Sequence, residues 1–166
     1  MLSELPQRLL ISGVPGAGKS CFADWLGVRG YTVLKADEHP FQVNAILSTT
    51  SRGLAVLVKA LGALRRRVII EVGFQPEEHW TTAVRTMRAA GFDSWWFDAT
   101  YHDALRAFRS RKGNEDGFEP QWSKIDSHRQ QIEALYRNRI IMTLRDGTHM
   151  PPEQIATVIG ARAQAE

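Results

Sequence analysis

Residues 13–20 have the sequence Gly13-Val14-Pro15-Gly16-Ala17-Gly18-Lys19-Ser20, a complete match to the pattern G-x-x-x-x-G-K-[ST]. Small residues in such a loop allow backbone N–H groups to close around an anion without a side chain in the way. A helix that begins directly after the loop points its positive dipole end at the same anion. The stretch therefore predicts a loop that holds the phosphates of a nucleotide.

The pattern also predicts which groups hold ATP and magnesium. The Lys19 ammonium reaches the β- and γ-phosphates, and the Ser20 hydroxyl is a ligand of Mg²⁺. Cys21 follows the loop, and we expect its side chain to be a small packing residue rather than a nucleophile. The nucleotide-binding residues expected here are Gly13, Val14, Pro15, Gly16, Ala17, Gly18, Lys19, Ser20 and Cys21.

Apolar runs alternate with amphipathic stretches on both sides of the loop. The apolar runs predict strands at Arg8–Ser12, Tyr31–Lys35, Val68–Val72, Ser94–Phe97 and Ile140–Leu144. The amphipathic stretches predict helices at Lys19–Arg29, Pro40–Leu47, Gly53–Leu64, Pro76–Ala90, Ala104–Arg111, Trp122–Arg137 and after Pro151. Interleaved strands and helices favour one α/β domain, residues 1–166, with a parallel sheet covered on both faces. The polar stretch Gly113–Pro120 has the composition of a mobile flap.

Composition limits the class of protein. The 166 residues are 43% hydrophobic and 23% charged, as in ordinary globular domains. We find no apolar run near the ~20 residues that a membrane span needs, and no signal-peptide pattern. One cysteine excludes an intrachain disulfide and a cysteine-cluster metal site. We therefore expect a cytoplasmic protein without a membrane partner, whose oligomeric state the sequence does not define.

Other classes of nucleotide-binding protein leave marks that are missing here. There is no Asn-Lys-x-Asp sequence for guanine recognition, which argues against a GTPase. The third predicted strand ends in Ile69-Ile70-Glu71-Val72 and lacks the Asp-Glu pair expected of many hydrolytic ATPases. The chain is also short for a motor or a ring ATPase.

With these residues in place, the chain resembles the small P-loop kinases: adenylate-kinase-like enzymes, gluconate and shikimate kinases, chloramphenicol phosphotransferase, zeta toxins and the kinase half of polynucleotide kinase. Pro15 in the loop and the acid in Leu34-Lys35-Ala36-Asp37 are similar to theirs. Glu71-Val72-Gly73-Phe74 is similar to the Asp-Gly-Phe segment of adenylate kinases, with Glu in place of Asp. A helix with Arg106 and Arg109 is similar to their arginine lid. The likeness covers nearly the whole chain.

This resemblance implies a three-layer P-loop kinase fold with helices on both faces of the sheet. It implies a five-stranded parallel sheet of order 2-3-1-4-5 and a short lid at about residues 106–120. It also implies transfer of a phosphoryl group from ATP to an acceptor hydroxyl or phosphate.

Two acids lie at the carboxyl ends of predicted strands, at the edge of the sheet where ligands bind in such folds. Asp37 is a candidate catalytic base that accepts the proton of an acceptor hydroxyl. Its alternative role is a helix N-cap, because Asp37-Glu38-His39-Pro40 is also typical of a helix start. Glu71 is a candidate magnesium residue that holds a metal-bound water or contacts the substrate, and its alternative role is a structural acid paired with an arginine.

Three arginines are further candidates for nucleotide binding. Arg106 and Arg109 are three residues apart and share a helix face. A lid arginine neutralises charge on the transferred phosphoryl group, and we favour Arg109 as the catalytic one. The alternative is an exposed basic face paired with Asp103, Glu115 or Asp116. Arg145 follows the fifth strand, in a loop that lies along the adenine in the kinases that this chain resembles. It either stacks on the base or belongs to a surface turn.

The predicted function is an ATP-dependent kinase of a small molecule or nucleotide. Two alternatives stay open. In the first, the acceptor is a polynucleotide 5′-hydroxyl or a nucleotide sugar, and a basic channel leading to Asp37 would favour this alternative. In the second, the protein is an ATPase switch that regulates a partner protein. This second alternative predicts slow hydrolysis and no acceptor pocket beside Asp37.

Overall fold

The computed structural model describes residues 5–35, 67–73, 79–112 and 115–163. These residues form one sheet with strands β1 (Arg8–Gly13), β2 (Tyr31–Lys35), β3 (Arg67–Glu71), β4 (Asp93–Ala99), β5 (Ile140–Arg145) and β6 (Thr148–His149). The order is β2-β3-β1-β4-β5-β6, and the first five strands are parallel. The predicted order 2-3-1-4-5 is therefore confirmed.

The sixth strand was not predicted. β6 runs antiparallel to β5, with Leu144 opposite His149 and Arg145 opposite Thr148. The two residues between the strands are Asp146 and Gly147, with φ of 51° and 74°. Asp-Gly is a typical two-residue hairpin turn, because both residues tolerate positive φ. This signal was present in the sequence.

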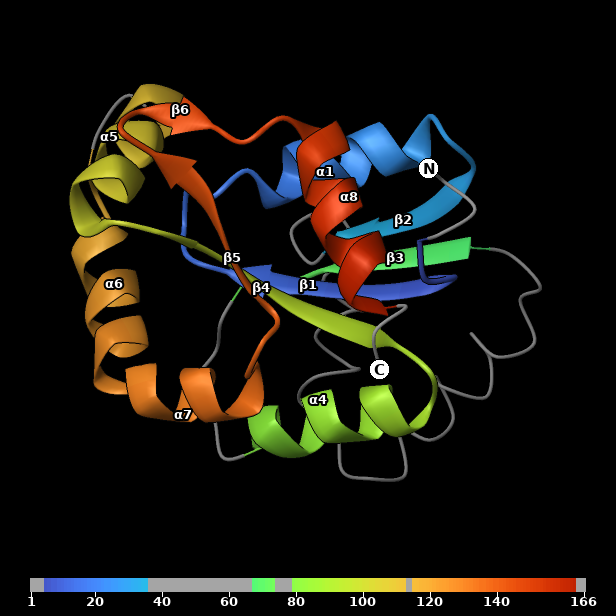
Figure 1. Cartoon of the computed structure of the whole chain (residues 1–166). Helices are drawn as coiled ribbons and strands as arrows, with labels where there is room; N and C mark the ends of the chain where they lie inside the picture. The colour runs from blue at the N-terminus through green and yellow to red at the C-terminus, as the bar shows by residue number, and fades with distance from the viewer. Residues whose placement is uncertain (1–4, 36–66, 74–78, 113–114, 164–166) are drawn as a thin grey trace.

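Helices cover both faces of the sheet (Figure 1). One face carries α1 (Lys19–Gly27) and α8 (Pro152–Ala163), and the other carries α4 (His79–Ala89) and α7 (Arg129–Leu135). The helices α5 (Tyr101–Lys112) and α6 (Phe118–Ser127) stand at the end of the sheet toward which β4 runs. The carboxyl ends of the parallel strands therefore meet near α5 and the start of α1.

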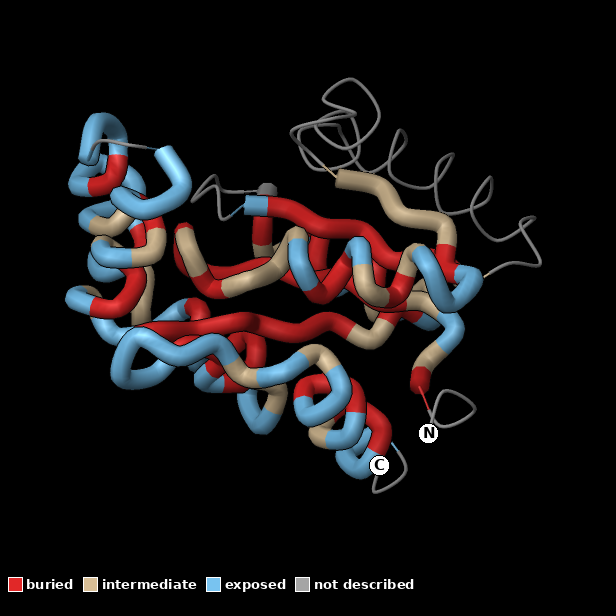
Figure 2. Tube along the Cα trace, turned by 90° about the horizontal axis from the view of Figure 1, so that it is seen from above, coloured by how far each residue is buried: buried red, intermediate tan, exposed pale blue. Residues whose placement is uncertain are grey.

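Continuous apolar strands make the core, as expected for a parallel sheet covered on both faces. Leu9, Leu10 and Ile11 of β1 are fully buried, as are Trp95 and Trp96 of β4. The central strands are buried along nearly their whole length (Figure 2). The packed strands give the loop after β1 a rigid support.

The predicted flap at 113–120 is wrong over its last three residues, because α6 begins at Phe118. Phe118 is fully buried, and its ring centroid lies 5.4 Å from that of Phe108 in α5 and 5.6 Å from that of Tyr101. This aromatic packing joins α6 to α5. It explains why a stretch of polar composition becomes helical as soon as it reaches an aromatic residue.

The predicted helix Trp122–Arg137 is two helices, α6 and α7, which meet at His128. The hydroxyl of Ser127 donates to the Lys124 carbonyl at 3.0 Å, and the His128 ring lies 2.8 Å from the same oxygen. These side chains satisfy a carbonyl at the end of α6, as polar groups do at helix ends. The predicted helices Pro40–Leu47 and Gly53–Leu64, and the predicted helix start at Pro76, lie outside the described residues.

None of the helices in the described ranges is long and apolar enough to span a membrane.

Candidate active site

The loop between β1 and α1 depends on glycine at two positions. A Cβ on Gly13 would collide with the backbone carbonyl of Phe97 in β4, and the Val14 N–H donates to that carbonyl at 3.0 Å. Gly18 has φ of 79° and stands directly before α1. Only glycine adopts that conformation readily. The loop is therefore pressed against the carboxyl end of β4 and leads into the positive end of α1.

Lys19 folds back across this loop. Its Nζ donates to the carbonyls of Gly13 and Val14, at 3.1 and 2.9 Å. The two bonds hold the ammonium group inside the curve of the loop. A positive charge in that position faces any anion that the loop amides bind.

Ser20 and Glu71 meet beside the loop. The Ser20 hydroxyl donates to Glu71 Oε1 at 2.9 Å, and Glu71 is only 8% exposed. The contact arises because β3 lies next to β1, with Glu71 opposite Ile11. A hydroxyl and a carboxylate are oxygen ligands of the kind that Mg²⁺ prefers. The hydroxyl of Ser20 and the carboxylate of Glu71 thus fit the oxygen donors that a magnesium ion would use.

A small cavity of about 180 Å³ lies on the outer side of the loop, between α1, the β5–β6 hairpin and the start of α8. Cys21 and Phe22 line it from α1, and His149, Met150 and Pro151 line it from the other side. The Cys21 side chain is exposed, so the prediction that it is a packing residue is wrong. The Cys21 side chain is therefore directed toward this cavity rather than into the core.

His149 is a neighbour of the loop that sequence reasoning missed. A Cβ built on Gly18 would lie 3.2 Å from Nδ1 of His149, so the imidazole covers that glycine. The hairpin turn at Asp146-Gly147 brings it there. The Asp-Gly pair in the sequence is typical of a hairpin turn. Such a turn directs the chain back toward the loop, and this signal could have identified His149 as a neighbour of the loop.

Asp103, in the first turn of α5, holds the hairpin in place. Its carboxylate accepts hydrogen bonds from the backbone N–H groups of Asp146 and Gly147, at 3.0 and 2.7 Å. It also accepts from the Thr100 hydroxyl at 2.9 Å. These hydrogen bonds lower the pKa of Asp103 below its usual value, and the bond from Thr100 has the largest effect. α5 and the hairpin are therefore joined through the hydrogen bonds that the Asp103 carboxylate accepts.

We expect the Asp103 bonds to make stability fall in acid. The pKa of Asp103 is lower in the folded protein than in the unfolded chain. Its contribution is therefore fully present above about pH 4 and is lost as the pH falls further through the folded-state pKa. Thermal unfolding measured from pH 3 to pH 6 should show a steeper fall in Tm at low pH for the wild type than for Asp103→Asn. Asp126→Asn, at an exposed site on α6, serves as the control, and equal slopes for all three proteins would contradict the assignment.

The structure separates the two predicted lid arginines. A Cβ on Gly147 would lie 2.7 Å from a guanidinium nitrogen of Arg106, so Arg106 packs against the hairpin turn. Arg109 forms an exposed ion pair with Glu115. Arg145 is exposed at the end of β5, next to the same turn. Arg106 and Arg145 thus lie near the hairpin, whereas Arg109 lies farther along α5.

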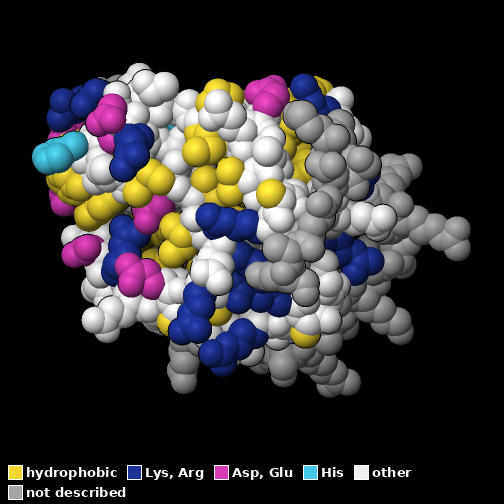
Figure 3. All heavy atoms as spheres, in the orientation of Figure 1, with side chains coloured by type: hydrophobic (Ala, Val, Ile, Leu, Met, Phe, Trp, Pro, Cys, Tyr) yellow, Lys and Arg dark blue, Asp and Glu magenta, His cyan; other side chains and the backbone are white. Residues whose placement is uncertain are grey.

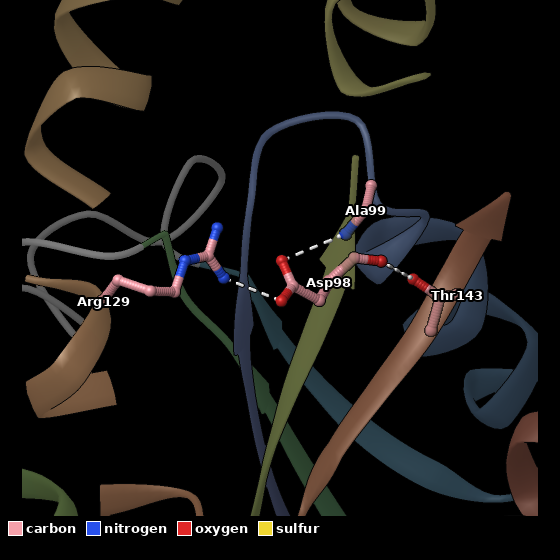
Figure 4. Close-up of polar contacts among 4 residues, drawn as sticks. All are labelled: Asp98, Ala99, Arg129 and Thr143. Carbon is pink, nitrogen blue, oxygen red and sulfur yellow. Dashed lines mark hydrogen bonds and ion pairs between the residues drawn. The ribbon is translucent and has the colours of Figure 1, made fainter. Parts of the chain in front are cut away.

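An ion pair at the end of β4 was also missed. Arg129 of α7 donates to Asp98 Oδ2 at 2.7 Å, and Asp98 Oδ1 accepts from the Ala99 N–H at 3.1 Å (Figure 4). Asp98 directly follows Phe97, whose carbonyl holds the Val14 N–H of the loop. The signal available in the sequence was an acid that follows a buried strand. Asp37, the predicted base, lies outside the described residues.

Together, the strand order, the glycine loop between β1 and α1, and the lysine and serine that follow it define the P-loop kinase fold. Comparison with models of protein families and with curated proteins finds no match. Solved structures do match. A gluconokinase from Sinorhizobium meliloti is similar over 97% of this chain and 93% of its own, with 15% identity and a TM-score of 0.55.

A shikimate kinase from Acinetobacter baumannii, in complex with shikimate, is similar over 97% of this chain and 94% of its own, with 15% identity and a TM-score of 0.56. The tunicamycin resistance protein of Deinococcus radiodurans covers 94% of this chain and 94% of its own, with 16% identity and a TM-score of 0.51. At such identities the likeness is one of fold.

Proposed function

We propose that the protein is an ATP-dependent kinase that transfers the γ-phosphate to a hydroxyl or phosphate group of a small molecule or nucleotide. The observation that carries the proposal is the convergence of three groups at one edge of the sheet. The loop amides supply donors for the phosphates, Lys19 supplies the positive charge, and the Ser20–Glu71 pair supplies oxygen ligands. Phosphoryl transfer needs mainly such positioning and charge neutralisation.

In this proposal the phosphates lie along residues 13–21, and Mg²⁺ is held beside Ser20 and Glu71. The bound magnesium would neutralise charge on the β- and γ-phosphates. The nucleoside lies toward the cavity between Cys21 and the hairpin, with Arg106 and Arg145 near the base. Asp37 orients and deprotonates the acceptor, and Arg109 neutralises charge on the transferred group after rearranging from its pair with Glu115.

The cavity allows a direct test of where the nucleotide lies. Cys21 is the only cysteine, is exposed and lines that cavity. We expect MgADP to slow alkylation of Cys21 by iodoacetamide at least about tenfold at saturation, since bound ligand shields the site in proportion to its occupancy. Intact-protein mass measured over time gives the rate. The same assay on Lys19→Ala should show little protection, and equal alkylation of the wild type with and without MgADP would place the nucleotide elsewhere.

The acceptor is proposed to be a small molecule rather than a polynucleotide. Arg145 and Arg162 line a groove of about 480 Å³ between the β5–β6 hairpin and α8. On the face of the molecule that Figure 3 shows, Lys and Arg side chains gather below the middle, whereas Asp and Glu side chains lie mostly toward the α5–α6 end. The groove follows β5, which three strands separate from β2. Asp37 lies outside the described residues, so the groove is not assigned to the acceptor. Support for a small acceptor comes from the similar solved structures, which include a gluconokinase and a shikimate kinase in complex with shikimate.

The experiment that tests the proposal is an acceptor screen. Purified protein with MgATP is offered gluconate, shikimate, other sugars, nucleosides, antibiotics that include tunicamycin, and 5′-hydroxyl oligonucleotides. ADP release above the blank for a small molecule supports the kinase, and release only with oligonucleotides supports the polynucleotide alternative. Slow release that no acceptor stimulates supports the ATPase switch.

With a true acceptor in hand, Asp37→Asn should lower kcat and leave ATP affinity nearly unchanged.

A further inference from the structure

Thr143 of β5 reaches the phosphate loop from outside. It is only 1% exposed, and its hydroxyl donates to the Ala17 carbonyl at 2.7 Å. The Asp98 carbonyl lies 3.3 Å from the same oxygen (Figure 4). A hydroxyl has one proton to donate, and the shorter distance assigns that proton to Ala17.

An irregularity in the sheet directs this side chain to the loop. Asp98 and Ala99 are consecutive residues of β4, and they pair with Met142 and Leu144 of β5. Thr143 is therefore an extra residue of β5 in the pairing of these two strands. The in-and-out alternation of β5 breaks at the same point, because Thr143 and Leu144 are both buried. A β-bulge turns a side chain to a new direction and is common beside functional sites.

The bond controls one peptide of the loop. A peptide unit is planar and trans, so its C=O and N–H point to opposite sides. Thr143 holds the carbonyl of the Ala17–Gly18 peptide toward β5, and the Gly18 N–H therefore points away from β5. Glycine permits either orientation of this peptide at little cost, so the chain itself does not determine the direction.

We propose that Thr143 is a positioning residue for nucleotide binding, which keeps the Gly18 N–H directed at the phosphates. The proposal rests on the proposed function, since it needs a nucleotide phosphate in the loop. Loss of the hydroxyl leaves a buried carbonyl without its donor and allows the peptide to rotate. The loop then loses one of its preorganised donors for the phosphates.

The test uses two matched pairs of side chains at position 143. Threonine and valine differ only by hydroxyl against methyl, and serine and alanine differ only by the hydroxyl. The wild type, Thr143→Val, Thr143→Ser and Thr143→Ala are titrated with MgADP in a calorimeter, and their thermal unfolding is recorded. We expect Kd about tenfold higher for Val than for Thr, and about tenfold higher for Ala than for Ser, with Ser close to the wild type.

A control separates positioning from general destabilisation. Val84→Ala truncates a fully buried residue of α4, on the other face of the sheet, and should lower Tm without changing Kd. If Thr143→Val does not fold, the Ser and Ala pair decides alone. Equal affinities within the pairs, or a Kd change in Val84→Ala that matches its loss of Tm, would overturn the role of Thr143. Absence of MgADP binding to the wild type would overturn the proposed function instead.

Discussion

Lys19→Ala is expected to abolish phosphoryl transfer, with kcat/KM reduced roughly 10³-fold or more, as when a preorganised donor to the reacting group is lost. The ammonium lies inside the loop, held by the carbonyls of Gly13 and Val14. In the proposed function, a bound triphosphate would place its negative charge against this group, and the attraction between the two charges is strongest where water is excluded. Alanine removes the charge and the donor for both carbonyls at once.

ADP production with the acceptor found in the screen measures this effect. Lys124→Ala, at an exposed site on α6, is the matched control and should behave as the wild type. Thermal unfolding shows whether the loop variant stays folded. Turnover of a folded Lys19→Ala protein within tenfold of the wild type would remove Lys19 from the mechanism.

Glu71→Gln is expected to raise the magnesium concentration needed for half-maximal activity roughly 10–100-fold, as is typical when a residue that supports a metal is changed. Glutamine keeps the shape of glutamate and still accepts the Ser20 hydrogen bond. The difference between the two proteins is therefore the charge of one buried carboxylate, which in the proposed function would lie beside Mg²⁺. Binding of ADP without magnesium should change little.

Activity measured against Mg²⁺ concentration, at fixed total ATP, gives this comparison. Glu153→Gln is the control. Glu153 of α8 accepts a hydrogen bond from Trp25 of α1 and has no part in the proposed site. If Glu71→Gln lowers Tm but leaves the magnesium dependence unchanged, Glu71 is a structural partner of Ser20. That outcome would support a structural role for Glu71, through Ser20 rather than through the arginine that the sequence analysis considered.

Much of the fold was predictable because its signals are local. A continuous apolar run makes β1, small residues make the loop, and a helix-forming stretch follows within the same 20 residues. The flap prediction was wrong over residues 118–120 because composition was weighed over eight residues, whereas α6 begins at Phe118, whose ring packs against α5. The roles of Asp37, Arg109 and Arg145 remain predictions.

By itself, the sequence determined the class of fold, the glycine-rich loop proposed to bind phosphate and the candidate charges around it, since each depends on neighbouring residues and on their periodicity. Only the tertiary structure decided which distant groups meet: Ser20 with Glu71, Asp98 with Arg129, Asp103 with the hairpin turn, and Thr143 with Ala17. These contacts join the ends of different strands and helices. Strand order, a bulge in β5 and close packing against the loop set their distances, and none of these is a property of a short stretch of chain.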